Sequence, residues 1–175
     1  MLYFLLSIIL IVIDQVVKAW VRGSLALGES IPFLPYLLDL TYTQNTGAAF
    51  SFLAGADLTW LLALVSLAAT VVLAVLLWKD FFPGFWGRLS LSLILAGAAG
   101  NLIDRAFLGF VTDMFQTIFM DFPVFNVADV CVVCGGGLMI FYILFFYDKD
   151  KAPTAAPDEK PEEATDGSED DHDQP

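Results

Sequence analysis

Two aspartates occur in stretches of sequence that are otherwise almost free of charge. Asp104 is the first charged residue after Arg88, and Asp129 is the only charged residue between Val124 and Tyr147. A charge inside a bilayer costs about 2.5 kcal/mol or more, so such residues usually serve a function. Two neighbouring carboxyls cannot both ionise easily, so one keeps a proton while the other acts as a base. Such a pair can activate water against an amide carbonyl and protonate the departing amine, without a metal.

Polar side chains near these aspartates recur three or four residues apart, which is the spacing of residues on one face of a helix. The sets are Asn101, Asp104 and Arg105; Asn126 and Asp129; and Asp14 and Lys18. Along a helix, Asp104 lies about 24 Å from Arg88. Along the last apolar segment, counted as a helix in the same way, Asp129 lies about 28 Å from Asp148, the residue that follows this segment. We therefore expect the two carboxyls to reach a similar depth near one membrane interface, where polar groups of three helices could meet.

Each of these features also has a purely structural interpretation. Asp14 and Lys18 can form an ion pair within one helix, and Asp104 with Arg105 can form a charge pair at the membrane interface. Asp129 is harder to explain in this way, because no basic residue is its neighbour in the sequence.

The remaining motifs favour packing over chemistry. Cys131 and Cys134 form a CxxC inside an apolar stretch, with no second pair to complete a zinc site. Gly135–Gly137 lacks the residues of a phosphate-binding loop and, like Ala96–Gly100, would permit close helix contact. The one histidine, His172, lies in a polar tail, so no Ser/His/Asp triad and no histidine-based metal site can be assembled. We expect neither a metal nor another cofactor.

The composition indicates that membrane-spanning helices position these residues. Of the 175 residues, 58% are hydrophobic and 16% are charged, and the mean hydropathy is +0.72. These values argue against a water-soluble domain, a nucleic-acid-binding protein and a disulfide scaffold. Four apolar segments of about 20 residues can each cross a bilayer core of about 30 Å. They are Met1–Trp20, Leu58–Trp78, Leu89–Leu108 and Val124–Tyr147. We predict an all-α membrane protein with four transmembrane helices.

The first segment resembles a cleaved signal peptide only weakly, because it has no basic start and is interrupted by charges. Basic residues near the segment ends number four against three, which favours both termini in the cytoplasm.

Residues 1–147 would form the transmembrane domain. Residues 148–175 carry eleven acidic and three basic side chains, and we expect a disordered cytoplasmic tail. Leu38–Tyr42 and Phe50–Leu53, separated by a turn at Gln44–Gly47, predict a small extracytoplasmic β-sheet between the first two helices.

Four stretches of the chain carry a family resemblance. They are IDQVVK (Ile13–Lys18), NTGAAFSF (Asn45–Phe52), GNLIDRAFLGFVTD (Gly100–Asp113) and FPVFNVADVCVVCG (Phe122–Gly135). Together, and in this order, they resemble bacterial lipoprotein signal peptidase, signal peptidase II, over about Met1 to Tyr147. The resemblance implies a four-helix intramembrane aspartyl endopeptidase of the bacterial inner membrane, with its site near the extracytoplasmic face. The family cleaves prolipoproteins just before a cysteine that carries diacylglyceryl, and the cyclic peptide globomycin inhibits it.

By matching motifs, the resemblance implies that Asp104 and Asp129 form the catalytic dyad. The residues implied to line or organise the site are Asp14, Lys18, Asn45, Gly47, Asn101, Arg105, Asn126 and Ala128. The segment VTDMF departs from the expected pattern, in which an aspartate follows one or two apolar residues, so the role of Asp113 stays open. The alternative is a proton-coupled transporter with the same acids as a relay. It is less favoured because the acids gather toward one face and no inverted repeat is visible.

Overall fold

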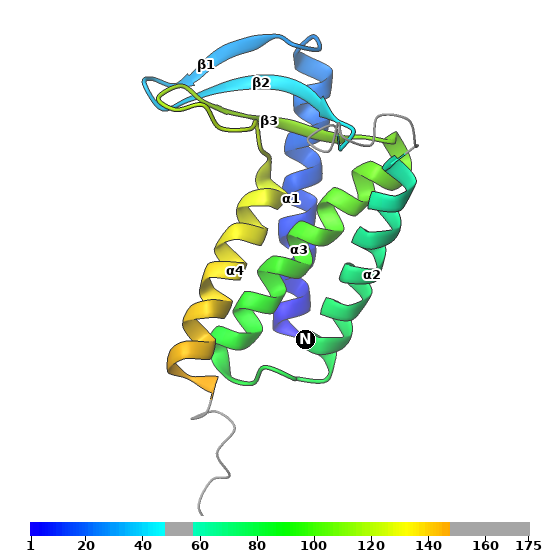
Figure 1. Cartoon of the computed structure of the whole chain (residues 1–175), viewed down its shortest axis with the longest axis vertical. Coiled ribbons are helices and arrows are strands. Elements are labelled where there is room, and N and C mark those ends of the chain that lie inside the picture. Colours follow the sequence, from blue (N-terminus) through cyan, green and yellow to red (C-terminus); the bar gives the residue numbers. More distant parts are fainter. Residues whose placement is uncertain (48–57, 148–175) are drawn as a thin grey trace, which may run out of the picture.

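The computed structural model describes residues 1–47 and 58–147, in which four helices form a bundle and three strands cover one end of it (Figure 1). The helices are α1 (Leu2–Ser24), α2 (Leu58–Trp78), α3 (Gly84–Leu108) and α4 (Val127–Phe145), and the strands are β1 (Ser30–Leu34), β2 (Leu38–Asn45) and β3 (Val111–Thr117). All four helices are long and apolar enough to cross a membrane. The predicted all-α membrane fold with four spans and a small sheet is confirmed.

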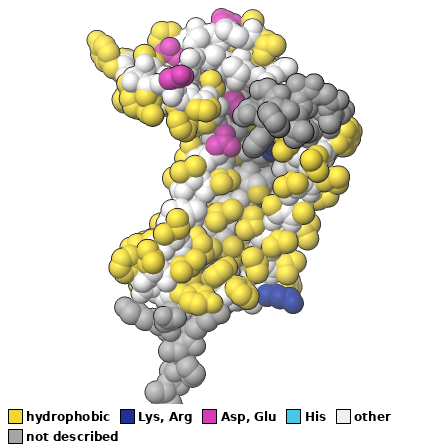
Figure 2. All heavy atoms as spheres, in the orientation of Figure 1, with side chains coloured by type: hydrophobic (Ala, Val, Ile, Leu, Met, Phe, Trp, Pro, Cys, Tyr) yellow, Lys and Arg dark blue, Asp and Glu magenta, His cyan; other side chains and the backbone are white. Residues whose placement is uncertain are grey.

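The surface of the bundle suits a lipid environment. Figure 2 shows hydrophobic side chains over most of the visible face of the helices, while Asp and Glu side chains gather on the sheet and where it meets the helices. Leu64, Val72 and Leu144 are 62%, 56% and 70% exposed, which is unfavourable in water but not in hydrocarbon. The start of α1, the α2–α3 connection and the end of α4 all lie at the end of the bundle away from the sheet (Figure 1).

The sheet is antiparallel, in the order β1-β2-β3, and its third strand comes from a connection in which we expected none. The predicted strand Leu38–Tyr42 is present but continues to Asn45, so the chain does not yet turn at Gln44. Phe50–Leu53 lies outside the described residues, as does the tail 148–175. β3 shows no alternation of buried and exposed residues, because its first four residues are all buried. A buried apolar cluster from α1 and the residue that follows it, β2 and β3 fixes the sheet to the bundle: Val21, Leu25, Leu40, Tyr42 and Met114.

α4 begins at Val127, three residues later than predicted, because Asn126 caps it. The Asn126 side chain accepts a hydrogen bond from the backbone N–H of Asp129, and the Asp129 side chain accepts one from the backbone N–H of Asn126. This reciprocal arrangement is a capping box, which satisfies two otherwise free N–H groups. The first turn of α4 therefore holds the Asp129 carboxyl in a fixed position.

α3 is the central helix and packs against α1, α2 and α4. Its crossing with α4 is close: a Cβ at Gly97 would overlap the Ala128 carbonyl oxygen, and a Cβ at Gly135 would overlap Ile94. The expected tight contact is therefore present at these glycines. It does not extend to Gly136, where a Cβ would have no neighbour within 4 Å.

We expect Gly97→Ala to lower the stability of the bundle by about 1–3 kcal/mol, because the added methyl group must force α3 and α4 apart. Thermal unfolding in detergent measures this effect. Gly136→Ala is the matched control, since it adds the same methyl group in open space and improves helix propensity. Equal unfolding temperatures for the two variants would contradict the tight crossing.

Candidate active site

Asp104 lies in a buried ionic cluster between α1 and α3. The side chains of Lys18 and Asp104 are both 0% exposed, and Lys18 Nζ lies 3.4 Å from Asp104 Oδ2. Lys18 Nζ also lies 2.9 Å from Asp14 Oδ2, so the ion pair predicted within α1 is confirmed and joined by a second carboxylate. The backbone N–H of Thr112 donates to Asp104 Oδ2 at 2.8 Å. A buried cation thus holds two carboxylates from two helices together.

Two further α1 residues complete the surroundings of Asp104. Gln15 Nε2 donates to Asp104 Oδ1 at 3.2 Å, and Arg22 Nη1 lies 3.9 Å from the same oxygen. Arg105, the sequence neighbour proposed as a partner for Asp104, instead donates to Ser66 Oγ of α2 at 3.3 Å. Consecutive residues of a helix project about 100° apart, so Asp104 and Arg105 face different neighbours.

Asp129 is held by two asparagines. Asn101 Nδ2 donates to Asp129 Oδ1 at 2.8 Å, and the backbone N–H of Asn126 donates to Asp129 Oδ2 at 3.2 Å. In return, Asn126 Oδ1 accepts from the backbone N–H of Asp129 at 2.9 Å. The two asparagines thus fix both oxygens of the Asp129 carboxyl.

A third aspartate, Asp113 of β3, belongs to the same network. Asn126 Nδ2 donates to Asp113 Oδ1 at 2.7 Å, and Asn45 Nδ2 donates to Asp113 Oδ2 at 3.0 Å. Burial raises the pKa of Asp113 to about 6; the negative charge of Asp129 adds to this, while the bonds from Asn126 and Asn45 oppose it. Asp113 and Asp129 therefore share Asn126 as a hydrogen-bond partner and influence each other electrostatically.

The link between Asp104 and Asp129 is less direct. Lys18 Nζ, beside Asp104, donates to Asn101 Oδ1 at 2.9 Å, and the amide nitrogen of Asn101 then faces Asp129. A lysine and an asparagine thus separate Asp104 from Asp129, whereas a single asparagine connects Asp113 with Asp129.

Most of the residues named for site organisation meet in this one network. Ala128 donates its backbone N–H to Asp14 Oδ1 at 2.8 Å, which ties the first turn of α4 to α1. Gly47, with a left-handed φ of 87°, donates its N–H to Asn45 Oδ1 at 2.9 Å. Arg105 forms its hydrogen bond with Ser66 of α2 instead, but its charge interacts with those of Asp129, Asp113 and Asp104. The residues joined by hydrogen bonds or ion pairs are Asp14, Lys18, Asn45, Gly47, Asn101, Asp104, Asp113, Asn126, Ala128 and Asp129.

A cavity of about 420 Å³ opens beside this network. It is lined by Asn45, Asp129 and apolar side chains of α4 and of the segment before it, among them Phe122, Phe125 and Val133. Asp129 is half-buried and thus reaches both the network and the cavity. A water molecule and an apolar peptide segment could both approach the carboxyl from this side.

The two cysteines of the CxxC take different positions. Cys131 is buried, in agreement with the expected packing role, while Cys134 is exposed and lines the cavity. Within residues 1–47 and 58–147, no group of three or more His, Cys, Asp or Glu side chains could hold a metal ion. The expected absence of a metal cofactor stays a prediction.

The family model described as signal peptidase (SPase) II matches residues 6–145. The chain belongs to the signal peptidase II family. A lipoprotein signal peptidase of Enterococcus faecalis is 42% identical over 142 residues, which cover 81% of this chain and 87% of the relative. One of Clostridioides difficile is 42% identical over 151 residues, covering 86% of this chain and 100% of the relative. The chain is thus a signal peptidase II protease, and its spans make it a multi-pass protein of the bacterial inner membrane.

Solved structures agree with this family. One described as a bacterial membrane enzyme determined by the in meso method at 1.9 Å resolution has a TM-score of 0.75 and 32% identity, covering 82% of this chain and 93% of the other. A second, at 2.3 Å resolution, has a TM-score of 0.73 and 29% identity. The resemblance stated from the motifs is confirmed, and the transporter alternative is not favoured. Asp113 is the polar residue of the network that motif matching left without a role.

Proposed function

We propose that this signal peptidase II family member is an intramembrane aspartyl endopeptidase that removes signal peptides from prolipoproteins. Cleavage would take place just before the cysteine that carries diacylglyceryl. The observation that carries the mechanism is the coupling of two aspartates, Asp113 and Asp129, through the side chain and backbone of Asn126. The substrate class follows from relatives that bear the name lipoprotein signal peptidase.

The contacts favour Asp113 over Asp104 as the partner of Asp129. Asp104 already has two cationic partners, Lys18 and Arg22, with which it forms ion pairs. The described groups that bind Asp113 are neutral amides. Asp113 can therefore keep a proton while Asp129 is ionised, which is the state that paired-aspartate catalysis needs. The dyad Asp104–Asp129, implied by motif matching, stays a prediction that these contacts support less well.

In the proposed reaction, water lies between the two carboxyls. The water oxygen attacks the carbonyl carbon of the scissile peptide bond while Asp129 accepts a proton from the water. At the same time Asp113 gives its proton to the carbonyl oxygen. The tetrahedral intermediate then collapses: the C–N bond breaks, the proton on Asp129 passes to the departing amine, and the intermediate's hydroxyl returns a proton to Asp113. Asn101 and Asn126 hold the carboxyls in place through these steps.

The surroundings fit an apolar, membrane-borne substrate. The cavity at Asp129 would take apolar residues next to the scissile bond, and a lipid anchor would concentrate the substrate in the same bilayer. We place both termini in the cytoplasm and the site near the extracytoplasmic face. The support is the bias of basic residues and the position of the site at the sheet end of the bundle.

The test uses the purified full chain in detergent with a prolipoprotein that does or does not carry diacylglyceryl. We expect cleavage of the lipidated form immediately before its cysteine, as read by the masses of both products. The reaction should continue in EDTA and stop with globomycin. Cleavage at another position, or no cleavage in the absence of a membrane and an ion gradient, would refute the proposal and favour the transporter alternative.

The pKa of Asp113 also predicts a pH dependence. With Asp113 as the proton donor and a pKa near 6, kcat/KM should fall as the pH rises above about 6. The Asn45 bond stabilises the ionised form, so Asn45→Ala should raise the pKa and move this fall up by about one pH unit. The Gln44 side chain donates to the Tyr42 hydroxyl and not to Asp113, so Gln44→Ala should leave the pH profile of kcat/KM unchanged. A downward shift for Asn45→Ala would assign the donor role to another group.

A further inference from the structure

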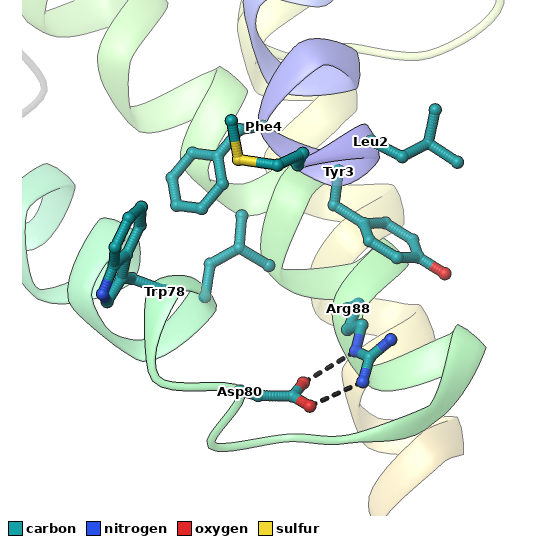
Figure 3. A pocket seen from close by; sticks show the side chains of 8 residues that line it. Leu2, Tyr3, Phe4, Trp78, Asp80 and Arg88 are labelled. Carbon is teal, nitrogen blue, oxygen red and sulfur yellow. Dashed lines mark hydrogen bonds and ion pairs between the residues drawn. The ribbon is translucent and has the colours of Figure 1, made fainter.

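A second cavity of about 420 Å³, shown from close by in Figure 3, lies at the end of the bundle opposite the sheet (Figure 1). It is formed by the start of α1, the end of α2 and the α2–α3 connection with the first turns of α3. The residues used below are Phe4, Leu77, Trp78, Asp80 and Arg88, all of which line it. None of them belongs to the network around Asp113 and Asp129. The helices begin and end here, so the cavity lies at the level of a membrane–water interface.

One part of the cavity carries two opposite charges side by side. Arg88 Nε and Nη2 donate to the two carboxylate oxygens of Asp80 at 2.7 and 2.5 Å. The Arg88 and Asp80 side chains are 40% and 42% exposed. A guanidinium has five N–H donors, of which this pairing uses two, and each carboxylate oxygen can accept a further bond. The Arg88 guanidinium also holds the pKa of Asp80 below its usual value, so the pair stays charged at neutral pH.

The other part of the cavity is apolar and aromatic. The rings of Phe4 and Trp78 meet edge to face with their centroids 6.3 Å apart, and Trp78 is 74% exposed (Figure 3). Leu77 is buried and belongs to a core cluster against which Phe4 packs. Tryptophan is enriched at the membrane interface, where its ring lies beside lipid headgroups. An acyl chain entering from the bilayer would meet this wall before its headgroup reached the ion pair.

The local charge selects among lipids. The two charged side chains that line the cavity, Asp80 and Arg88, cancel each other, and each keeps hydrogen-bonding capacity that their pairing does not use. A headgroup with one phosphate and one ammonium group has no net charge and matches both members of the ion pair.

We propose that this cavity binds a zwitterionic aminophospholipid, with its phosphate on Arg88, its ammonium on Asp80 and one acyl chain against Phe4 and Trp78. The site is separate from the catalytic network and does not depend on the function proposed above.

Native mass spectrometry of the full chain in detergent tests this site with two probes of identical chains, dioleoyl phosphatidylethanolamine and dioleoyl phosphatidylglycerol. We expect the ethanolamine lipid to bind at least about fivefold more tightly than the glycerol lipid. Asp80→Asn should remove this preference, because it removes the charge that holds the ammonium group, while Arg88, freed from its ion pair, still binds the phosphate of either lipid. Arg88→Gln should weaken both lipids. Lys79→Gln, which changes an adjacent exposed charge that does not line the cavity, is the matched control and should change neither.

Two further measurements keep the result clear if a charge variant unfolds. Trp78→Ala should weaken both lipids about equally and preserve their ratio, because it removes only the apolar wall. Soluble glycerophosphoethanolamine should not compete, since it lacks acyl chains. Equal binding of the two lipids by the unaltered chain, or full competition by the soluble headgroup, would overturn the proposal.

Discussion

Asp113→Asn is expected to lower kcat/KM for a lipidated prolipoprotein on the order of 10³-fold, because an amide can neither give nor accept the proton that the reaction needs. Asp129→Asn should have an effect of the same size, and the double variant should lose little more, since the two carboxyls act as one unit. The measurement is the cleavage rate per folded enzyme, with folding checked by thermal unfolding in the same detergent. Both variants should unfold near the temperature of the unaltered chain.

Asp104→Asn is the control that separates the two dyads. The substitution keeps the shape of the side chain but removes a buried negative charge beside Lys18 and Arg22. We expect a lower unfolding temperature, and a cleavage rate per folded molecule that falls far less than with Asp113→Asn. An inactive but stable Asp104→Asn together with an active Asp113→Asn would restore the dyad that the motifs imply.

Lys18→Met should be the most destabilising of the substitutions considered. The Lys18 side chain is 0% exposed and contacts the carboxylates of Asp14 and Asp104. Removing the cation leaves two buried carboxylates without compensation, and breaking such a buried pair costs about 3–5 kcal/mol. Lys18, together with Asn126, also orients Asn101 by donating to its Oδ1, so the folded fraction should cleave more slowly. Unfolding by heat and cleavage per folded molecule are the two measurements.

The double variant Lys18→Met with Asp104→Asn tests the electrostatic origin of this loss. It should be more stable than Lys18→Met alone, because one of the uncompensated charges is gone. Lys79→Met, at an exposed position, controls for the loss of a lysine side chain in general. If the loss of stability in the double variant equals the sum of the losses in Lys18→Met and Asp104→Asn, the two residues do not interact and the cluster has another role.

Features that depend on local spacing were predictable from the sequence. An apolar run of about 20 residues spans a bilayer wherever it occurs, so all four helices were found from length and hydropathy. The ion pair of Asp14 and Lys18 follows from their separation by one helical turn. The tight contact at Gly97 follows from the absence of a side chain.

The proposed dyad partner and the third strand were not predictable in this way. Asp113 acquires its environment because β3 pairs with β2, which lies far away in the chain, and because Asn126 of the α4 cap reaches it. A strand whose first residues are buried on both faces shows no alternation, so its sequence carried no clear signal. The sequence by itself determined the spans, the membrane environment and most of the polar residues that converge. Only the tertiary structure decided which carboxyls become neighbours, because long-range strand pairing and helix rotation leave no periodic trace in the sequence.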